Sequence, residues 1–562
     1  MRSRSCCLIL FIAFVSALSP LRTARAQPEV STADPVHPNI LWITTEDMSA
    51  QLGAYGDEIA RTPNLDRLAD EGIRYTNVYS VYGVCAPNRS ALITGLYPSS
   101  YGAHHMRTTS RTASIAEVTD PELLAIPTYE AVPPPEARLL SELLRRHGYY
   151  ATNNAKEDYQ FTAPVTAWDE SSPKAHWRNR LDADTPFFAV FNIEITHESQ
   201  IWGRAGEPLV TDPDAVEVPP YYPDTPVVRR DIARNYDHIA LMDDEVGRIL
   251  DELQEDGLLD ETIVFFFSDH GSGLPRAKRW VYDSGLHVPL IVRFPHARRA
   301  GAVEERLVSF VDFAPTVLSL AGVPVPEYLP GMAFLGPAEG PQRRYVHAAR
   351  DRMDPALDTR RAVRDARYKY IRNYRPERPY VQVLPYRDQM PLMQEILRLR
   401  RDGGLDSTRH WQLLRETKPL QELYDTVEDP HEINNLAEDP RYREKLLELR
   451  QEQERWFDEI DDMGLIPEPV LKNMLFPPYG EQPETDPPEL HAAQARGGVI
   501  VRLTSATHGA SIGYRAGSDD TWKVYTRPFF VPSGASLTAV AHRIGFKPSP
   551  EIDTTFSQRS ER

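Results

Sequence analysis

Short apolar runs that end in polar residues alternate along this chain with helical segments, and this alternation most limits the folds open to it. Five runs have the length and composition of buried strands: 39–43, 149–152, 187–193, 262–267 and 288–292. Three segments between them have the apolar spacing of helices: 63–72, 139–147 and 228–256. Alternation of this kind is typical of βαβ units. The sequence therefore predicts an α/β fold, with a mostly parallel sheet sandwiched by helices.

The N-terminus has the pattern of a secretory signal. Two arginines precede a mostly apolar stretch at 8–18, and a small-x-small motif at 24–26 supplies the site read by a signal peptidase. We expect residues 1–26 to be removed during export, to the periplasm or outside a bacterial cell. No later run reaches the roughly 18 to 20 apolar residues that a spanning helix needs, so no membrane anchor is expected.

Charge and cysteine content exclude several classes of protein. The chain has 63 Lys and Arg against 81 Asp and Glu, a net charge of −18, which argues against general binding to nucleic acid or anionic membrane. Of three cysteines, Cys6 and Cys7 lie in the signal. Cys85 then stands alone, so we expect no intramolecular disulfide in the exported chain.

Carboxylates follow two of the predicted strands. Glu46 and Asp47 come after the run at 39–43, and Asp269 and His270 come directly after the run at 262–267. Ligands of such sheets bind beyond the carboxyl ends of the strands, so both pairs are expected at one edge. Carboxylates that converge repel one another unless a cation neutralises them, and oxygen-rich sets favour calcium or magnesium.

The segment Cys85-Ala-Pro-Asn-Arg89, followed by Thr94-Gly95, resembles the signature of the type I sulfatases, within the alkaline-phosphatase-like superfamily. Further strings extend the resemblance over most of 38–460: Thr-Pro-Asn-Leu-Asp-Arg-Leu-Ala at 62–69, Ser-Asp-His-Gly at 268–271, Tyr-Asp-Ser-Gly-Leu-His-Val-Pro at 282–289 and Val-Asp-Phe-Ala-Pro-Thr at 311–316. The strings around Lys156 and His197 resemble a bacterial branch similar to heparan N-sulfatases (sulfamidases).

The resemblance implies a nucleophile made from Cys85. In the family a maturation enzyme oxidises this cysteine to formylglycine (3-oxoalanine), and one hydroxyl of its hydrate attacks sulfur. The residues that the resemblance assigns to one Ca²⁺ per chain are Glu46, Asp47, Cys85, Asp269 and His270. It also implies that Arg89 stabilises the hydrate, that Lys156 contacts sulfate, and that His197 and Lys278 lie near the leaving group.

Three positions depart from the family pattern. The usual pair of aspartates is Glu46-Asp47, and the common Asp-Asn pair is Asp269-His270. The histidine usually found two residues after the first catalytic lysine is replaced by Asp158. We expect these changes to shift the metal and to remove one contact with the hydrate.

Charged residues outside the signature are candidates for substrate recognition. Such groups suit hydroxyls and carboxylates of an acidic sugar, and arginine suits bidentate recognition. Surface charge pairing is the alternative explanation for them. The candidates are His104, His105, Arg107, Arg350 and Asp351, with Arg352 beside them.

The predicted domain boundaries follow from changes in composition and in the predicted secondary structure along the chain. Residues 38–345 form the predicted catalytic α/β domain, and 346–465 a smaller subdomain with an antiparallel sheet. The proline-rich stretch 466–495 reads as a linker. The tail at 496–562 alternates in strand fashion and resembles the small β-sandwich module of chitobiases and hexosaminidases, which either binds carbohydrate or stabilises the protein.

These observations predict an exported hydrolase that removes sulfate from sulfated glycans of the glycosaminoglycan kind, including N-sulfoglucosamine. Its partners would be the glycan and the formylglycine-generating enzyme, without nucleic acid. One alternative is an O-sulfatase of algal-type polysaccharide. Others are a phosphodiesterase or phosphonate hydrolase of the same superfamily, and a glycan-binding protein that has lost catalysis.

Overall fold

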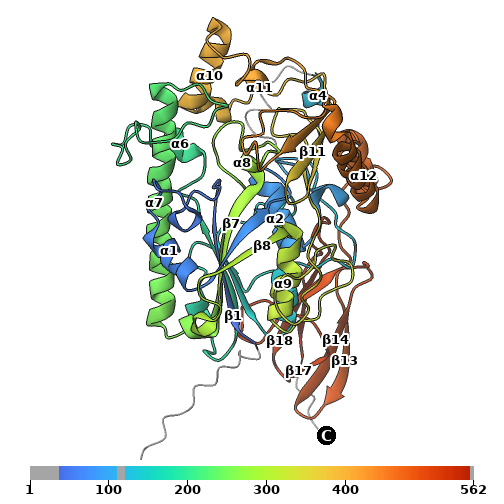
Figure 1. Cartoon of the computed structure of the whole chain (residues 1–562). Helices are drawn as coiled ribbons and strands as arrows, with labels where there is room; N and C mark the ends of the chain where they lie inside the picture. Colours follow the sequence, from blue (N-terminus) through green and yellow to red (C-terminus); the bar gives the residue numbers. More distant parts are fainter. Residues whose placement is uncertain (1–36, 111–120, 557–562) are drawn as a thin grey trace, which may run out of the picture. The chain divides into compact units, whose positions relative to one another are not determined.

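The computed structural model describes residues 37–110 and 121–556, so the predicted signal at 1–26 lies outside the described residues. An eight-stranded sheet in the order β4-β3-β5-β1-β6-β7-β2-β8 lies at the centre (Figure 1). Its strands are β1 (Asn39–Thr45), β2 (Ile73–Tyr79), β3 (Tyr150–Asn154), β4 (Glu170–Ser171), β5 (Phe187–Ile193), β6 (Thr262–Ser268), β7 (His287–Arg293) and β8 (Ala302–Ser309). The predicted α/β fold with a mostly parallel sheet is confirmed.

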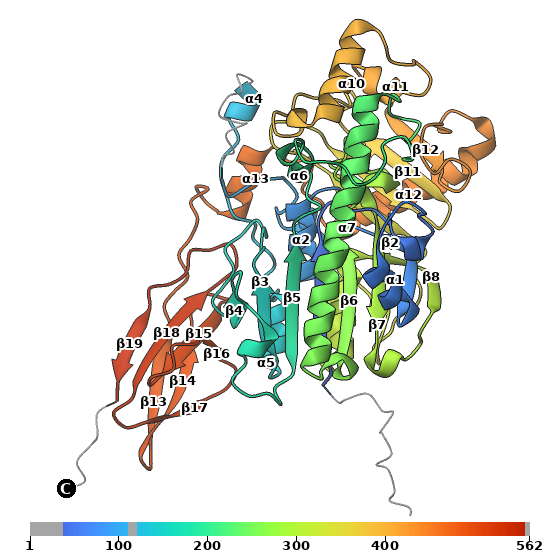
Figure 2. The ribbon, with the colours of Figure 1, turned by 90° about the vertical axis from the view of Figure 1, so that its left-hand side faces the viewer.

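Both faces of this sheet are buried under helices, as its continuous apolar strands require. Ile40 and Trp42 of β1 point into one hydrophobic cluster, and Leu41 and Ile43 point into the other. One face is covered by α1 (Pro63–Asp70) and α7 (Pro226–Glu255), and the other by α2 (Cys85–Thr94), α5 (Leu140–Arg146) and α9 (Phe313–Leu320) (Figures 1 and 2).

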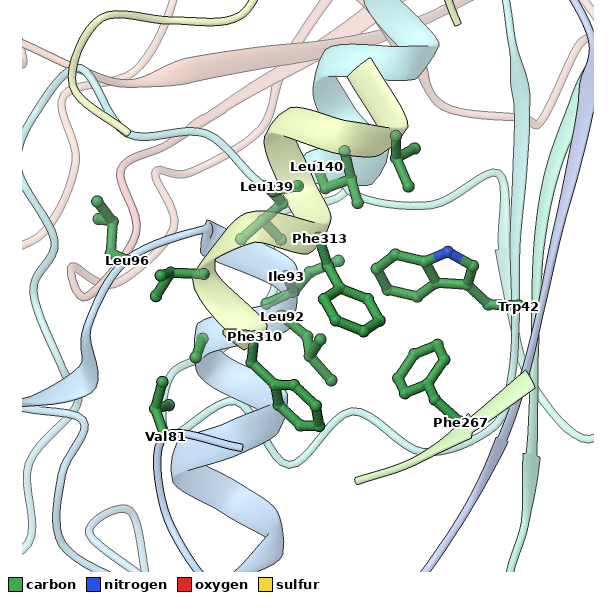
Figure 3. Packing of buried hydrophobic residues seen from close by; sticks show 14 of the residues in the cluster. Trp42, Val81, Leu92, Ile93, Leu96, Leu139, Leu140, Phe267, Phe310 and Phe313 are labelled. Carbon is green, nitrogen blue, oxygen red and sulfur yellow. The ribbon is translucent and has the colours of Figure 1, made fainter. Parts of the chain in front are cut away.

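Phe313, the first residue of α9, packs between α2 and the sheet. Phe313 packs edge-on against Trp42 and against Phe267 at the end of β6, with ring centroids 6.0 and 4.9 Å apart. Leu92 and Ile93 of α2 complete this cluster (Figure 3). The position of Cys85, at the start of α2, is therefore fixed by the core below it.

One strand of the predicted parallel set runs the other way. β7 is antiparallel to both β6 and β2, whereas β1 is parallel to β5 and to β6. Between β6 and β7 the chain has only the short helix α8 (Asp283–Leu286), which does not cross back over the sheet. A strand that starts at the edge where its predecessor ended must pair antiparallel.

A second, four-stranded antiparallel sheet follows in the order β12-β11-β10-β9. Its strands are β9 (Val346–Arg350), β10 (Arg360–Arg364), β11 (Tyr368–Asn373) and β12 (Gln421–Asp425). The helix α12 (Arg443–Glu459) packs on this sheet through Leu446 and Leu449. Shorter or more peripheral helices include α4 (Pro121–Leu124), α6 (Ser199–Gly203), α10 (Pro391–Asp402) and α11 (Trp411–Leu414).

The C-terminal residues form two small antiparallel sheets with their own apolar core, which includes Val501, Val531 and Leu537. Their strands are β13 (Glu489–Ala495), β14 (Gly498–Thr504), β15 (Ser511–Ala516), β16 (Lys523–Val524), β17 (Phe529–Pro532), β18 (Ser536–His542) and β19 (Ile552–Thr555). The stretch 466–495 is more ordered than the predicted linker, because it contains α13 (Glu468–Leu475) and all of β13. Glu468 explains part of this order, since Arg352 donates to its carboxylate at 2.5 and 3.1 Å.

No helix in the described part of the chain combines the length and the apolar character needed to cross a membrane.

Candidate active site

The ends of β1 and β6 bring two carboxylate pairs together. These strands pair in parallel with Thr45 opposite Ser268, so the residues that follow them leave the sheet side by side. The backbone N–H of Asp47 donates to Asp269 Oδ1 at 3.1 Å, and Asp47 has a left-handed φ of 54°. Gly273 leaves room for this turn, because a Cβ there would lie 2.9 Å from Asp47 Oδ2.

Cys85 is the first residue of α2 and is 2 % exposed. Asn88 holds the preceding loop, since its Oδ1 accepts from the N–H groups of Val81 and Tyr82 at 3.1 and 2.9 Å. The N-terminus of a helix carries unpaired N–H groups and a partial positive charge, which favour an anion beside residue 85. Cys85 Sγ lies 3.4 Å from His270 Nε2.

The groups at these strand ends fit a divalent cation. Two sets of donor atoms lie within 4.8 Å of one another: Glu46, Asp47, Cys85 and His197 in one, Asp47, Cys85, Asp269 and His270 in the other. Glu46 Oε2 and Asp269 Oδ2 are buried without a hydrogen-bond partner within the described residues. Buried carboxylate oxygens are normally satisfied, so these two are suited to an ion.

The imidazole of His270 is oriented as a metal ligand. Its Nδ1 lies 2.9 Å from the carbonyl oxygen of Gly271, which only accepts, so a neutral ring carries its proton there. In the protonated ring, Nε2–H donates to Asp47 Oδ1, 2.9 Å away, and in the neutral ring the lone pair of Nε2 would be free to bind an ion. Burial lowers the pKa of His270, but the carboxylates of Asp269 and Asp47 outweigh burial and hold it well above its ordinary value.

Three cationic side chains surround the carboxylates. Arg89, 6 % exposed, donates to Glu46 Oε1 at 3.0 Å, and its Nε lies 3.5 Å from Asp269 Oδ2. Lys156 Nζ contacts Glu46 Oε1, and Lys278 Nζ lies 2.8 and 2.7 Å from the two oxygens of Asp47. This density of positive charge suits an anionic substrate.

His197 and Lys278 lie near Cys85. His197 Nε2 is 3.9 Å from Glu46 Oε2, and its Nδ1 is 2.8 Å from Ser199 Oγ. Burial and Lys278 lower the pKa of His197, while Asp47 and a hydrogen bond with Cys85 raise it, and the net pKa is raised. Burial raises the pKa of the Cys85 thiol, the charge of Lys278 lowers it, and the net pKa is lowered.

Sequence reasoning missed two residues that hold these groups in place. Glu198 is buried, accepts from Arg279 at 2.5 and 2.8 Å, and donates its backbone N–H to Asp47 Oδ2 at 2.6 Å. Asn192 accepts from Arg89 Nη1 at 2.6 Å and from Thr44 Oγ1 at 2.9 Å. A signal for Asn192 was its place as a polar residue near the end of an apolar strand.

The predicted substrate-binding residues fall into two groups. His104 and His105 are buried, Arg350 donates to the carbonyl oxygen of Arg279 at 2.6 Å, and Asp351 accepts from Arg361 at 3.1 Å. These four are enclosed in the protein. Arg107 differs, because its side chain is 38 % exposed.

Asp158, which departs from the family pattern, has a local partner. Arg107 Nη1 donates to Asp158 Oδ1 at 2.7 Å. The carboxylate therefore orients an arginine at the entrance of the site.

Comparison with known proteins identifies the class of this site. A family model described as Sulfatase matches residues 38–323, and one described as N-sulphoglucosamine sulphohydrolase, C-terminal, matches residues 276–383. The chain belongs to the sulfatase family and is a hydrolase of sulfuric esters, so the resemblance read from the sequence is confirmed.

Individual relatives agree with this assignment. An ulvan-active sulfatase of Formosa agariphila is 47 % identical over 93 % of this chain and 92 % of its own length. Human N-sulphoglucosamine sulphohydrolase is 26 % identical over 84 % of this chain and 97 % of its own. The fold is shared with the structure of BT4656 in complex with D-glucosamine-2-N,6-O-disulfate, with a TM-score of 0.53, 19 % identity and coverage of 77 % of this chain and 99 % of that one.

Proposed function

We propose that this protein is an exported O-sulfatase of a sulfated polysaccharide, with ulvan as the first substrate to test. The observation that carries the proposal is the 47 % identity to an ulvan-active sulfatase over 93 % of the chain. The intact constellation of strand-end carboxylates, buried Arg89 and the start of α2 supports catalysis over a binding role without chemistry.

The carboxylates of Glu46, Asp47 and Asp269 and the imidazole of His270 would hold one calcium ion beside residue 85. Oxidised to formylglycine and hydrated, residue 85 supplies a hydroxyl nucleophile, and calcium supplies positive charge. Two unsatisfied carboxylate oxygens in this set support the assignment.

The chain's own side chains would perform the remaining tasks. Arg89, Lys156 and the N–H groups at the start of α2 would bind the sulfate oxygens and disperse their charge. Asn192 would keep the guanidinium of Arg89 in place. His197 or Lys278 would protonate the sugar oxygen as it leaves, since an alkoxide is a poor leaving group without a proton.

Sulfamate hydrolysis is a second candidate function. It is supported by the C-terminal family match at 276–383 and by the 26 % identity to the human sulphohydrolase. A sulfamate leaves as an amine, which takes up a proton more readily than an alkoxide, so this reaction makes a smaller demand on His197.

Sulfate release separates the two functions. The protein, made together with a formylglycine-generating enzyme, is incubated with ulvan oligosaccharides and with N-sulfated and O-sulfated glucosamine saccharides, and free sulfate is measured by ion chromatography. We expect release from ulvan and from O-sulfated sugars, with Cys85→Ala as the inactive control. Release only from N-sulfated sugars would overturn the O-sulfatase proposal in favour of the sulfamidase.

A further inference from the structure

Two loops at the site are tied to each other by hydrogen bonds. In the loop 350–358, the carbonyl oxygen of Arg352 accepts from the N–H of Met106 at 2.9 Å, and Arg352 donates its own N–H to His105 Nδ1 at 3.2 Å. Arg352 Nη1 also donates to the carbonyl oxygen of Met106 at 2.9 Å. These bonds place Arg107, the residue after Met106, against the loop 350–358.

Asp354 lies in the loop 350–358, and its carboxylate lacks a protein partner among the described residues. It is 6 % exposed, and within residues 37–110 and 121–556 its carboxylate has no hydrogen bond and no ion pair. Its φ of 52° is a conformation that favours glycine, so the turn holds the side chain at a backbone cost. The carboxylate oxygens of Asp354 are not fully enclosed, so this side chain, without a partner in the described part of the protein, is open to a ligand.

Another carboxylate of the same loop is fully paired. Asp358 lies 2.9 Å from Arg360 Nε, 3.2 Å from Lys418 Nζ and 3.5 Å from Arg350 Nε. Neighbouring cations therefore satisfy one buried aspartate of this loop, whereas Asp354 is left open.

Three arginines act on the charge of Asp354. Burial raises its pKa, while Arg279, Arg107 and Arg352 lower it, and the net pKa is raised. Arg107 is in turn influenced by Asp354 and by Cys85. The hydrogen bonds of Arg352 with His105 and Met106 bring the chain around Asp354 beside Arg107, and Arg107 donates to Asp158, two residues after Lys156.

An exposed aromatic ring lies on the leaving-group side of the site. Tyr386 is 39 % exposed, and its ring centroid is 6.3 Å from that of His197. Trp202 supports it edge-on at 5.2 Å. A tyrosine braced in this way offers a rigid apolar face at low entropic cost.

We propose that Asp354 and Tyr386 form the binding subsite for the sugar ring that carries the scissile sulfate, with Asp354 accepting from its hydroxyls and Tyr386 stacking on its face. A hydroxyl donor satisfies the open carboxylate, which an anionic group cannot do. Arg107, which Asp158 orients, binds the ring's own oxygens or a carboxylate on the neighbouring sugar. The subsite therefore selects a sugar with free hydroxyls next to the sulfate. This inference rests on the proposed glycan sulfatase function.

The test compares a glycan with a substrate that lacks a sugar. Matured wild type, Asp354→Asn, Tyr386→Ala and Tyr386→Phe are assayed on 4-nitrophenyl sulfate and on whichever oligosaccharide of the ulvan and glucosamine panel wild type cleaves fastest. Asp358→Asn is the matched control, because it removes a paired carboxylate from the same loop. Thermal melting of each variant checks the fold.

We expect the ratio of kcat/KM on the oligosaccharide to kcat/KM on the aryl sulfate to fall tenfold to a hundredfold in Asp354→Asn, chiefly through KM. Tyr386→Ala should lower the same ratio about tenfold, and Tyr386→Phe should retain it, since stacking needs only the ring. Asp358→Asn should lower the melting temperature and leave the ratio unchanged. An unchanged ratio in both Asp354→Asn and Tyr386→Ala would overturn the subsite. A wild type that cleaves the aryl sulfate and no glycan would instead contradict the proposed function.

Discussion

At the scale of single residues, Asp47 shows how closely the site is packed. Its carboxylate lies within 3 Å of Lys278, of His270 and of the backbone N–H of Glu198. Burial raises the pKa of this carboxyl, but Lys278 and the two histidines hold it well below its ordinary value. Each of these groups is therefore kept in its charge state by the others, and a change to one affects all.

The nucleophile gives the first prediction. Cys85→Ala should fold with an unchanged melting temperature and lose all measurable turnover, because no other side chain at the site supplies a geminal diol. Cys85→Ser should be almost as inactive. The measurement is sulfate release, with intact mass of the wild-type Cys85 peptide to show conversion of thiol to aldehyde. Activity above a few per cent in either variant would refute the assignment.

The cation gives the second prediction. Asp269→Asn keeps the shape of the side chain and removes one charge, so elemental analysis should find less calcium per chain and activity should fall at least a hundredfold. Chelation of the wild type should abolish activity and lower the melting temperature, because an ion present at about 100 times its Kd stabilises by about 2.7 kcal/mol. Calcium should restore both. Full activity and no bound metal in excess chelator would exclude the site.

The site residues that could be identified from the sequence are those that belong to local sequence motifs. Cys85 and Arg89 share one helix, and Asp47 and Asp269 each follow a strand, so local spacing was sufficient to find them. Asp354 was missed for the opposite reason. Its significance comes from lacking a partner in the folded protein, which no pattern of neighbours in the sequence reveals.

At the scale of elements, the register between β1 and β6 does most to build the site. Thr45 lies opposite Ser268, and a shift by one residue would turn the following carboxylates toward opposite faces of the sheet. The apolar runs predicted these strands within about two residues at each end. Their direction depends on the connections, and the short segment between β6 and β7 returns the chain along the sheet, so β7 is the antiparallel member of a sheet predicted to be mostly parallel.

The contact between α7 and α10 gives the third prediction. Asp231 of α7 accepts the N–H of Leu392 at 2.6 Å, and burial raises its pKa to about 6 although Arg234 and Arg230 lower it. The folded protein therefore keeps a proton that the unfolded chain releases near pH 4, and the free energy of unfolding falls as pH rises from about 4 through 6. Asp231→Asn should remove this penalty.

Chemical denaturation at pH 4.5 and pH 7.5 measures the effect. We expect Asp231→Asn to gain about 3 kcal/mol relative to wild type at pH 7.5, from about 1.4 kcal/mol per pKa unit over about two units, and only about 1 kcal/mol at pH 4.5. Asp244→Asn, at an exposed position of the same helix, is the control and should show no such dependence. A gain that is equal at both pH values would contradict the raised pKa.

At the scale of the whole chain, the C-terminal β module is joined to the catalytic domain by specific polar bonds. Glu142 of α5 is fully buried and accepts from Thr166 Oγ1 at 2.9 Å and from Ser511 Oγ at 2.7 Å. Arg145 Nη2 donates to the carbonyl oxygen of Trp522 at 2.5 Å. The module therefore braces the helix that precedes β3 and the Lys156 loop.

This junction gives the fourth prediction. Glu142→Ala leaves Arg146, Thr166 and Ser511 without their acceptor, so the free energy of unfolding should fall by about 3 kcal/mol. Limited proteolysis should then cut within 477–488, between α13 and β13. Ser511→Ala removes one hydrogen bond to a charged group and should cost about 1.5 kcal/mol. Resistance to protease equal to wild type in Glu142→Ala would show that the module stays docked without this residue.

The depth of Cys85 also sets an order of events during biogenesis. At 2 % exposure, with α2 buried along its whole length, the thiol is out of reach of any second enzyme once the domain has closed. The proposed oxidation of Cys85 would therefore have to precede folding, while the chain is still extended. Protein that folds first is committed to an inert thiol, and adding the maturation enzyme afterwards should rescue activity only after the chain has been unfolded and refolded.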